Sequence, residues 1–425
     1  MTNITEIRRT LKQREETGYW YGIEEDTAQA TPDFTRIGDM AMHQELPIQK
    51  KMKRCLLLDS GEVNYYTGAI DGTKKEDGTT AADLSGVDGQ WQTEVPAHYY
   101  KEEHEGTIVR YKFSELPVPG FTYIQKHYVS AGEAAIHRPT GKLACVVNNS
   151  ADYRGGDNNS SYDGQSNTLL GRPVTDISLT DSRSAAQLRG TGWITEIPTI
   201  SKAWRRLLFC EYATRNIQQP FNPNLDANGC KQGGLGPGVT TASSSEWSNF
   251  NGYRPFVPIG VTSSLGNATG VASYVATDFG GAGVNRTFEV PSYRGIENPF
   301  GHIWKWWDGY NLYNDGSNFT IYERDSISGL ADATSTGYTE VGTLPLSNGY
   351  ATEMNPGLLL PSLANASSTT KWCDYYYAGS TGWRVPLVGG TASAGASAGL
   401  VYVYTFHGAS RTYTTIGSRL CFFGA

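Results

Sequence analysis

Short apolar runs separated by glycine-containing turns make up much of the chain from residue 55 onward. Asp-Gly pairs recur within the first part of this region, at 71–72, 77–78 and 88–89. Aspartate and glycine tolerate the backbone angles of tight hairpin turns. The pattern therefore predicts short antiparallel strands with polar loops, and further strands are expected at 106–113 and 126–136.

Two segments place their apolar residues at helical spacing instead. Residues 181–189 begin with Asp and Ser, which can cap a helix, and are followed by Gly190. Residues 201–216 carry an apolar stripe formed by Trp204, Leu207, Leu208 and Tyr212. We expect this stripe to face the core. The arginines off the stripe are expected to face solvent: Arg205, Arg206 and Arg215.

The organisation predicted from these patterns has three parts. At roughly 100–200 residues per domain, a chain of 425 residues suggests two or three units. Residues 1–50, with a short amphipathic helix at 5–16, are expected to serve attachment or oligomerisation, because so short a helix needs a partner. Residues 51–95 form a hairpin-rich connection, and 96–425 form the main domain.

Charge and hydropathy exclude several classes of function. The chain has 35 basic and 42 acidic side chains and no long basic run, so nucleic acid is not an expected partner. No apolar stretch is long enough for a membrane span, and the first residues lack the apolar core of a signal peptide. We therefore expect synthesis in the cytoplasm without membrane insertion. Six scattered cysteines are expected to be reduced and buried.

Motifs that carry catalysis are missing from the sequence. The seven histidines are never at metal-binding spacing, and neither a nucleophile elbow nor a phosphate-binding loop is present. No metal, no cofactor and no catalytic residue is therefore assigned. Catalytic groups dispersed along the chain remain possible, because folding gathers residues that are distant in sequence.

The composition of the C-terminal segment differs from that of the rest. After Asp374 the sequence has no Asp, Glu or Lys, and is dominated by Tyr, Ser, Thr, Gly and Ala. Tyrosine offers a large amphipathic contact area at low entropic cost, and small polar residues offer adaptable hydrogen bonds. This composition is typical of binding surfaces, although the aromatic residues could also form core strands.

Alternation along residues 400–406 favours display of the aromatic side chains. In a strand, Val401 and Val403 would occupy one face and Tyr402, Tyr404 and Phe406 the other. The valines suit the core. The aromatic residues are then predicted to face a partner.

Three motifs resemble a known family. The segment 295–309, GIENPFGHIWKWWDG, is similar to a signature of the formylglycine-generating-enzyme branch of the C-type-lectin fold. The segments 382–385 with 389–390, and 417–420, resemble the elements that close this fold. The resemblance implies an α+β protein of this C-type-lectin type, with large loop insertions, preceded by a small β-rich N-terminal region.

Within this branch the chain most resembles the variable proteins of diversity-generating retroelements, and especially phage tail-fibre receptor-binding proteins. In that family a reverse transcriptase rewrites the last coding segment, here about 375–418, so that the displayed side chains differ between isolates. The resemblance implies that the variable ligand-binding residues are Tyr376, Tyr377, Thr391, Ser393, Ala394, Ser397, Tyr402, Tyr404, Thr405, Phe406, His407, Arg411, Tyr413 and Thr414. The residues assigned to the scaffold are Trp304, Trp306, Arg384 and Arg419.

The expected function is recognition of a host cell-surface protein or glycan, without catalysis. The family implies a homotrimer at the tip of a virion tail fibre, in contact with other fibre proteins. The enzymes of the branch use a cysteine pair near the end of the fold, and the stretch from Arg384 to Leu420 contains no cysteine, while Lys305 stands where those enzymes have glutamate. A formylglycine-type modifying enzyme and a bacterial lectin or adhesin without diversification are the alternatives.

Overall fold

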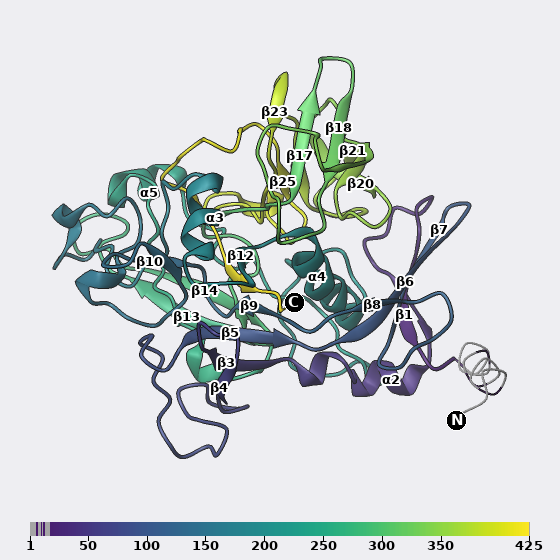
Figure 1. Ribbon diagram of the computed structural model, residues 1–425, viewed down its shortest axis with the longest axis horizontal. Helices are drawn as coiled ribbons and strands as arrows, with labels where there is room; N and C mark the ends of the chain where they lie inside the picture. The colour runs from purple at the N-terminus through teal and green to yellow at the C-terminus, as the bar shows by residue number, and fades with distance from the viewer. Residues whose placement is uncertain (1–5, 7–9, 11, 13–17, 425) are drawn as a thin grey trace.

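The computed structural model describes residues 6, 10, 12 and 18–424. The helix predicted at 5–16 lies, apart from three of its positions, outside the described residues. Figure 1 shows the strands distributed over several sheets, with α4 near the middle of the molecule.

Two sheets contain the first strands of the chain. A five-stranded antiparallel sheet has the order β2 (Thr35–Gly38), β1 (Tyr21–Asp26), β7 (Ile108–Ser114), β6 (His98–Glu105) and β8 (Thr122–Ile124). A six-stranded antiparallel sheet has the order β12 (Trp193–Thr195), β27 (Leu420–Phe422), β9 (His127–Ser130), β5 (Gln90–Val95), β3 (Lys53–Leu57) and β4 (Val63–Tyr66).

Two further sheets lie in the C-terminal part, drawn in green and yellow in Figure 1. A seven-stranded mixed sheet has the order β21 (Pro361–Ala366), β20 (Gly349–Met354), β22 (Tyr375–Tyr377), β25 (Val403–Tyr404), β24 (Leu387–Val388), β16 (Trp304–Trp306) and β26 (Ile416–Gly417). A four-stranded sheet has the order β19 (Thr339–Thr343), β18 (Phe319–Glu323), β17 (Tyr310–Asn314) and β23 (Gly382–Arg384).

Smaller elements complete the fold. The remaining strands are β13 (Gly270–Ala276), β14 (Arg286–Tyr293) and β15 (Ile296–Glu297) in one sheet, and β10 (Ala135–His137) and β11 (Lys142–Ala144) in a hairpin. The helices are α2 (Met40–Glu45), α3 (Leu179–Gln187), α4 (Pro198–Tyr212) and α5 (Ser244–Asn251). Short 3-10 turns are η1 (Gln49–Lys51), η2 (Ala151–Tyr153), η3 (Ser160–Tyr162), η4 (Ser263–Leu265) and η5 (Gly395–Ser397).

The α+β, C-type-lectin-type class expected from the sequence is wrong. The structure is 32% strand and only 14% helix, and its strands are divided among many sheets, so the protein is β-rich. Several strands of the seven-stranded sheet are only two or three residues long. Such short strands leave no periodic pattern in a sequence, so their individual positions could not be predicted.

The two predicted helices are confirmed as α3 and α4, each beginning two or three residues before its expected start. The Oγ of Ser178 caps α3 by accepting the backbone N–H of Asp181. Pro198 occupies the first turn of α4, where its missing N–H costs nothing, and Ala213 ends the helix in the left-handed conformation.

The expectation that the arginines of α4 and its C-terminal end face solvent is wrong, because this helix is surrounded by packed elements. Arg205 is buried against Glu196, with 3.1 Å between Nη1 and Oε1, and Arg215 is buried in an ion pair with Glu25. Arg206 is also buried, and its guanidinium covers the ring of a tyrosine on β6. A buried charge needs a partner, and each of these arginines has one.

The expected boundaries at residues 50 and 95 are crossed by the fold. β1 pairs with β7, so residues from the predicted attachment segment share a sheet with residues 98–124. One hydrophobic core includes Tyr21, Trp204 and Val403. Residues 18–50 are therefore integrated into the body of the protein.

Candidate functional site

The seven-stranded sheet presents different residues on its two faces. β22 pairs in parallel with β25, so that Tyr376 lies opposite Val403 and Tyr377 lies opposite Tyr404. Val403 and Tyr376 are fully buried on the inner face. Because side chains alternate along a strand, Tyr377 and Tyr404 stand on the outer face, where they are half-buried.

Rings from separate parts of the chain meet on this outer face. Tyr377 stacks on Tyr404 with their ring centroids 4.8 Å apart, and Tyr404 lies 5.4 Å from Trp304 of β16. On the neighbouring strand β20, Tyr350 meets Tyr375 edge-on at 5.1 Å. Pairs with such geometry contribute roughly 0.5–1.5 kcal/mol beyond burial of area, so the rings support one another.

The loop after β25 extends this row of rings. His407 lies 5.3 Å from Tyr404 and stacks on Tyr413 at 6.2 Å, and the Arg411 guanidinium covers Tyr413 at 5.2 Å. Phe406, at 43%, and Tyr413, at 45%, are the most exposed of these rings. We refer to the group as the aromatic surface; its members are Trp304, Tyr350, Tyr375, Tyr377, Tyr404, Phe406, His407 and Tyr413.

Electrostatics give the aromatic surface a neutral to positive character. Burial, with the nearby charges of Arg411 and Arg384, lowers the pKa of His407. Burial and the neighbouring hydroxyls of Tyr377 and Tyr413 raise the pKa of Tyr404. Both side chains are therefore neutral near pH 7, and the two guanidiniums carry the local charge.

Three residues predicted for display are buried and cannot contact a partner directly. Tyr376 is 0% exposed and donates its hydroxyl to the carbonyl of Pro345 at 2.9 Å. Thr405 is 0% exposed and donates its hydroxyl to the carbonyl of Tyr377 at 2.9 Å. Tyr402 is 8% exposed and packs beneath Trp304, with ring centroids 4.7 Å apart.

The local conformation explains these corrections. The extended stretch predicted over 400–406 is a strand only at Val403–Tyr404, so alternation does not continue to its neighbours. The predicted burial of Val401 and Val403 is confirmed. Leu400, which alternation would place on the same face as Tyr402, is also buried.

The other predicted binding residues lie around the aromatic surface or along its edges. Thr391, Ser393, Ala394 and Ser397 are half-buried in the loop that contains η5, and Ser397 Oγ lies 3.4 Å from the hydroxyl of Tyr350. Arg411 is exposed and Thr414 is half-buried at the opposite end. The aromatic surface therefore connects the loop that contains η5 with the loop after β25.

Sequence reasoning missed Tyr350 and Tyr375. Tyr375 and Tyr377 share a face of β22, and the two-residue period within that strand could have identified the pair. Tyr350 is brought to this face by the pairing of β20 with β22, which no local pattern indicates.

The residues assigned to the scaffold differ in burial. Trp306 and Arg419 are fully buried, as this role requires. Arg419 donates hydrogen bonds to backbone carbonyls of two separate segments, 130–132 and 297–298. Trp304 is half-buried within the aromatic surface, and Arg384 is half-buried beside it, so both can also take part in binding.

A buried ionic group holds the strand that carries Trp304. The Lys305 ammonium lies 2.8 Å from Glu133, whose other oxygen lies 2.6 Å from Nδ1 of His302. The Nε2 of His302 accepts backbone N–H groups of Phe256 and Val257, so the ring proton resides on Nδ1. Burial raises the pKa of Glu133, but Lys305 and His302 outweigh it and lower this pKa to about 2.

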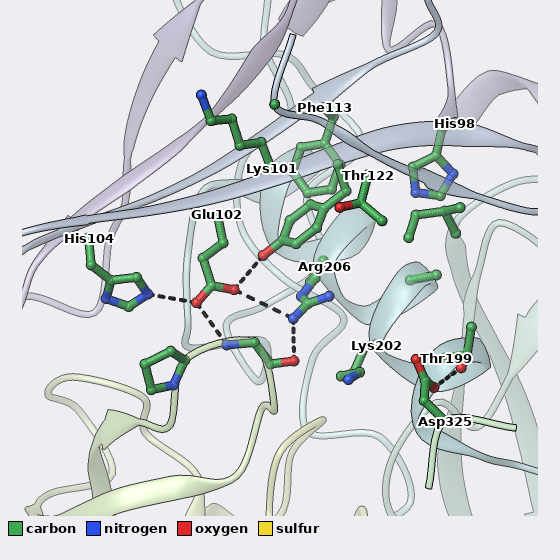
Figure 2. A pocket seen from close by; sticks show the side chains of 16 residues that line it. His98, Lys101, Glu102, His104, Phe113, Thr122, Thr199, Lys202, Arg206 and Asp325 are labelled. Atoms are coloured by element: carbon green, nitrogen blue, oxygen red, sulfur yellow. Dashed lines mark hydrogen bonds and ion pairs between the residues drawn. The ribbon is translucent and has the colours of Figure 1, made fainter. Parts of the chain in front are cut away.

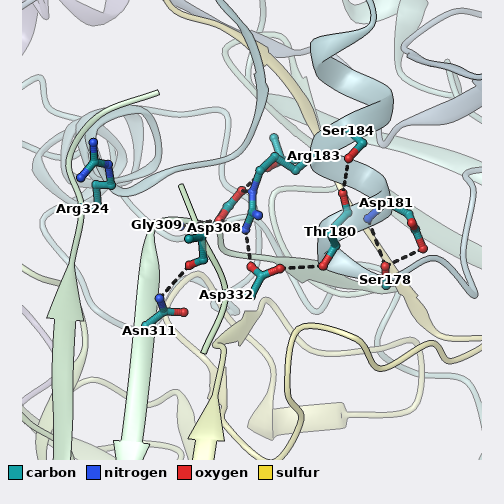
Figure 3. A network of polar contacts seen from close by, with 12 residues as sticks. Ser178, Thr180, Asp181, Arg183, Ser184, Asp308, Gly309, Asn311, Arg324 and Asp332 are labelled. Carbon is teal, nitrogen blue, oxygen red and sulfur yellow. Dashed lines mark hydrogen bonds and ion pairs between the residues drawn. The ribbon is translucent and has the colours of Figure 1, made fainter. Parts of the chain in front are cut away.

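A pocket of about 700 Å³ adjoins the aromatic surface. We call it the Trp383 pocket; it is lined by Trp383, Arg384, Phe406, His407, Arg411, Thr180 and Asp332, among others. Figure 3 shows the network around Asp332, whose carboxylate is held by Arg183 and by the hydroxyl of Thr180, at 2.6 Å each. Arg183 also pairs with the buried Asp308.

A second pocket, of about 520 Å³, lies between β6 and α4 (Figure 2). Glu102 in this pocket accepts hydrogen bonds from the Tyr100 hydroxyl and the Gly357 amide, and contacts Nε2 of His104. Burial raises the pKa of Glu102, but the Arg206 charge and these hydrogen bonds lower it overall. The carboxylate is thus already satisfied, and the group connects β6 with the loop at 356–357.

The described part of the chain contains neither a disulfide nor a cluster of metal-binding side chains. All six cysteines are free and buried, and burial raises the pKa of each thiol. Among residues 18–424, no three His, Cys, Asp or Glu side chains are grouped as a metal site would require. In the same range, every helix is too short or too polar to cross a bilayer.

Comparison with known proteins does not identify the chain. No protein-family model matches it, and no curated protein is significantly similar. Function is therefore inferred from the aromatic surface and the adjoining Trp383 pocket.

Proposed function

We propose that this protein is a receptor-binding protein that recognises a ligand on the surface of a host cell through the aromatic surface. The observation that carries the proposal is the row of half-buried and exposed rings on the outer face of the seven-stranded sheet, which is built from four separate segments. Exposed clusters of aromatic side chains are favourable for binding a partner and unfavourable in water.

The chemistry of this surface also supports recognition. Tyrosine combines an apolar ring with a hydrogen-bonding hydroxyl and loses little entropy when it is immobilised. The segment after Asp374 contains no carboxylate side chain that would have to be desolvated on binding. The surface is therefore suited to tight contact with a partner.

The resemblance to variable proteins of diversity-generating retroelements supports the further proposal that this protein acts at the tip of a phage tail fibre. Exposed positions such as Phe406 and Tyr413 adjoin buried anchors such as Thr405, so the displayed side chains can be exchanged while the backbone is held. A homotrimer, joined to other fibre proteins, would engage several ligands at once and gain avidity.

Attachment of the labelled protein to a panel of bacterial isolates tests the proposal. The double variant Phe406→Ala/Tyr413→Ala removes the two most exposed rings and should reduce attachment at least tenfold to isolates bound by the unaltered protein. The matched control is Tyr123→Ala, which removes a ring that is 55% exposed on β8. Undiminished attachment of the double variant, or an equal loss in the control, contradicts the proposal.

The DNA beside the gene tests diversification separately. A near-copy of the codons for residues 375–418 that differs mainly at adenines, next to a reverse-transcriptase gene, is the expected finding. Its absence would remove the diversification part of the proposal and leave a binder of fixed sequence.

A further inference from the structure

The Trp383 pocket carries positive charge that no carboxylate neutralises among the described residues. Arg384 donates to three neutral oxygens, namely the carbonyls of Trp383 and Thr381 and the hydroxyl of Ser380. Arg411 makes no ion pair within the described chain and instead covers the ring of Tyr413. These acceptors hold Arg384 in place and use three of its five N–H groups; since its Nε is buried, one N–H of Nη1 remains to donate to an anion.

The opposite side of the pocket carries an acceptor. Asp332 is 22% exposed, and each of its oxygens already accepts one hydrogen bond, from Arg183 and from Thr180. A carboxylate oxygen has two lone pairs, so each can accept one more donor. Fixed in this way, Asp332 is suited to accept hydroxyl groups and repels a second carboxylate.

The pocket wall between these two ends is aromatic. Trp383 is held in place by Tyr313 and Tyr322, at ring-centroid distances of 4.8 and 5.8 Å, and is half-buried. Phe406 lines the pocket as well. Aromatic rings offer apolar area to the C–H face of a ring-shaped ligand, and about 700 Å³ is within the range of roughly 300–1,000 Å³ found for small-molecule sites.

We propose that the Trp383 pocket binds a sugar residue that carries one carboxylate, such as the end of an acidic glycan. Its carboxylate lies at Arg384 and Arg411, its ring packs on Trp383, and its hydroxyls donate to Asp332. A densely acidic peptide is disfavoured, because its additional carboxylates would approach Asp332. The inference rests on the proposed receptor binding and specifies the chemistry of the receptor.

The test compares two sugars that differ only at C6, where one has a carboxylate and the other a neutral hydroxymethyl group. Binding of methyl β-glucuronide and methyl β-glucoside to the full chain is measured by saturation-transfer NMR and calorimetry. The glucuronide should bind and the glucoside should bind at least tenfold more weakly, since hydrogen bonds to charged groups are worth about tenfold or more in affinity. Acetate and hexaglutamate serve as the bare anion and the acidic peptide.

Variants assign the binding to the pocket. Arg411→Gln changes an exposed side chain, so the fold should be retained, and glucuronide affinity should fall about tenfold. Arg138→Gln, which removes the same charge from an exposed position outside the pocket, should have no effect. Asp332→Asn should weaken binding of both sugars.

Three outcomes overturn the inference. The first is that methyl β-glucuronide does not bind. The second is that acetate or hexaglutamate binds with the same affinity as the glucuronide and with the same dependence on Arg411. The third is that Arg411→Gln binds the glucuronide as tightly as the unaltered protein. Cell attachment separates this failure from failure of the proposed function. If attachment requires Phe406 and Tyr413 but free glucuronide does not inhibit it, the proposal of an acidic sugar is wrong while the proposal of receptor binding stands.

Discussion

Replacement of Tyr402 and of Phe406 by alanine should have opposite effects on folding and on binding. Tyr402 is 8% exposed, with its ring centroid 4.7 Å from Trp304 and 5.9 Å from Tyr375. Removing a large buried aromatic side chain costs about 3–5 kcal/mol, and we expect about 3 kcal/mol here because the ring lies just under the surface. Phe406 is 43% exposed, so its removal should cost less than about 1 kcal/mol.

Equilibrium unfolding in urea, followed by tryptophan fluorescence and circular dichroism, measures both costs. The difference of about 2 kcal/mol corresponds to roughly a thirtyfold change in the unfolding equilibrium constant. Tyr402→Phe serves as the control, because it keeps the ring contacts and should lose less than about 1 kcal/mol. Equal destabilisation by Tyr402→Ala and Phe406→Ala would refute the assignment of one ring to the core and the other to the surface.

Three further predictions concern the scaffold. Burial lowers the pKa of His127 to about 4, so protonation opposes folding. The contribution of neutral His127 to stability is present above the unfolded value of 6.5 and should be smaller by about 2 kcal/mol at pH 5. Because burial also lowers the pKa of His98 to about 4, His127→Gln should remove about half of the combined slope in urea titrations across pH. Lys305→Met leaves Glu133 without its cation and should lower the unfolding free energy by about 3–5 kcal/mol. The double variant Lys305→Met/Glu133→Gln should lose less unfolding free energy than the sum of the two single variants. Additive losses in this double-mutant cycle would show that the pair is not coupled. Gly399→Ala would place its Cβ 1.9 Å from Oδ1 of Asp374 and should lower the unfolding free energy by about 1–3 kcal/mol, and an unchanged unfolding midpoint would contradict this clash.

Local patterns predicted those elements whose signals are local. The helices α3 and α4 were found because nine and fifteen residues are enough to show capping residues and an apolar stripe. The two-residue strands β24, β25 and β26 show no period, and only their pairing in the folded chain defines them. For this reason the positions of these strands could not be predicted from the sequence.

In the candidate site too, features with a local signal were predicted and features that depend on distant segments were not. The composition after Asp374 indicated a binding surface, and the burial of Val401 and Val403 followed from simple alternation. The same alternation places Thr405 with Val401 and Val403, whereas the family resemblance assigned it to the displayed residues; its hydroxyl is in fact hydrogen-bonded to the carbonyl of Tyr377 on β22 and to the amide of Gly379. Likewise, the position of Arg205 off the apolar stripe suggested solvent exposure, whereas its partner Glu196 is brought to it only by folding.

The placement of buried anchors between displayed residues separates stability from recognition. Thr405 is bonded to β22 while the next residue, Phe406, is exposed, and Tyr376 is bonded to Pro345 while its neighbour Tyr377 forms part of the aromatic surface. A change at an exposed position therefore removes ring contacts but leaves the strand pairing intact. Because surface substitutions usually alter stability by less than about 0.5 kcal/mol, many sequences at these positions are compatible with one backbone. In the proposed Trp383 pocket the separation is partial: Asp332 and Arg384, which are held by their own hydrogen bonds, lie outside the proposed variable positions, whereas Phe406 and Arg411 are among them.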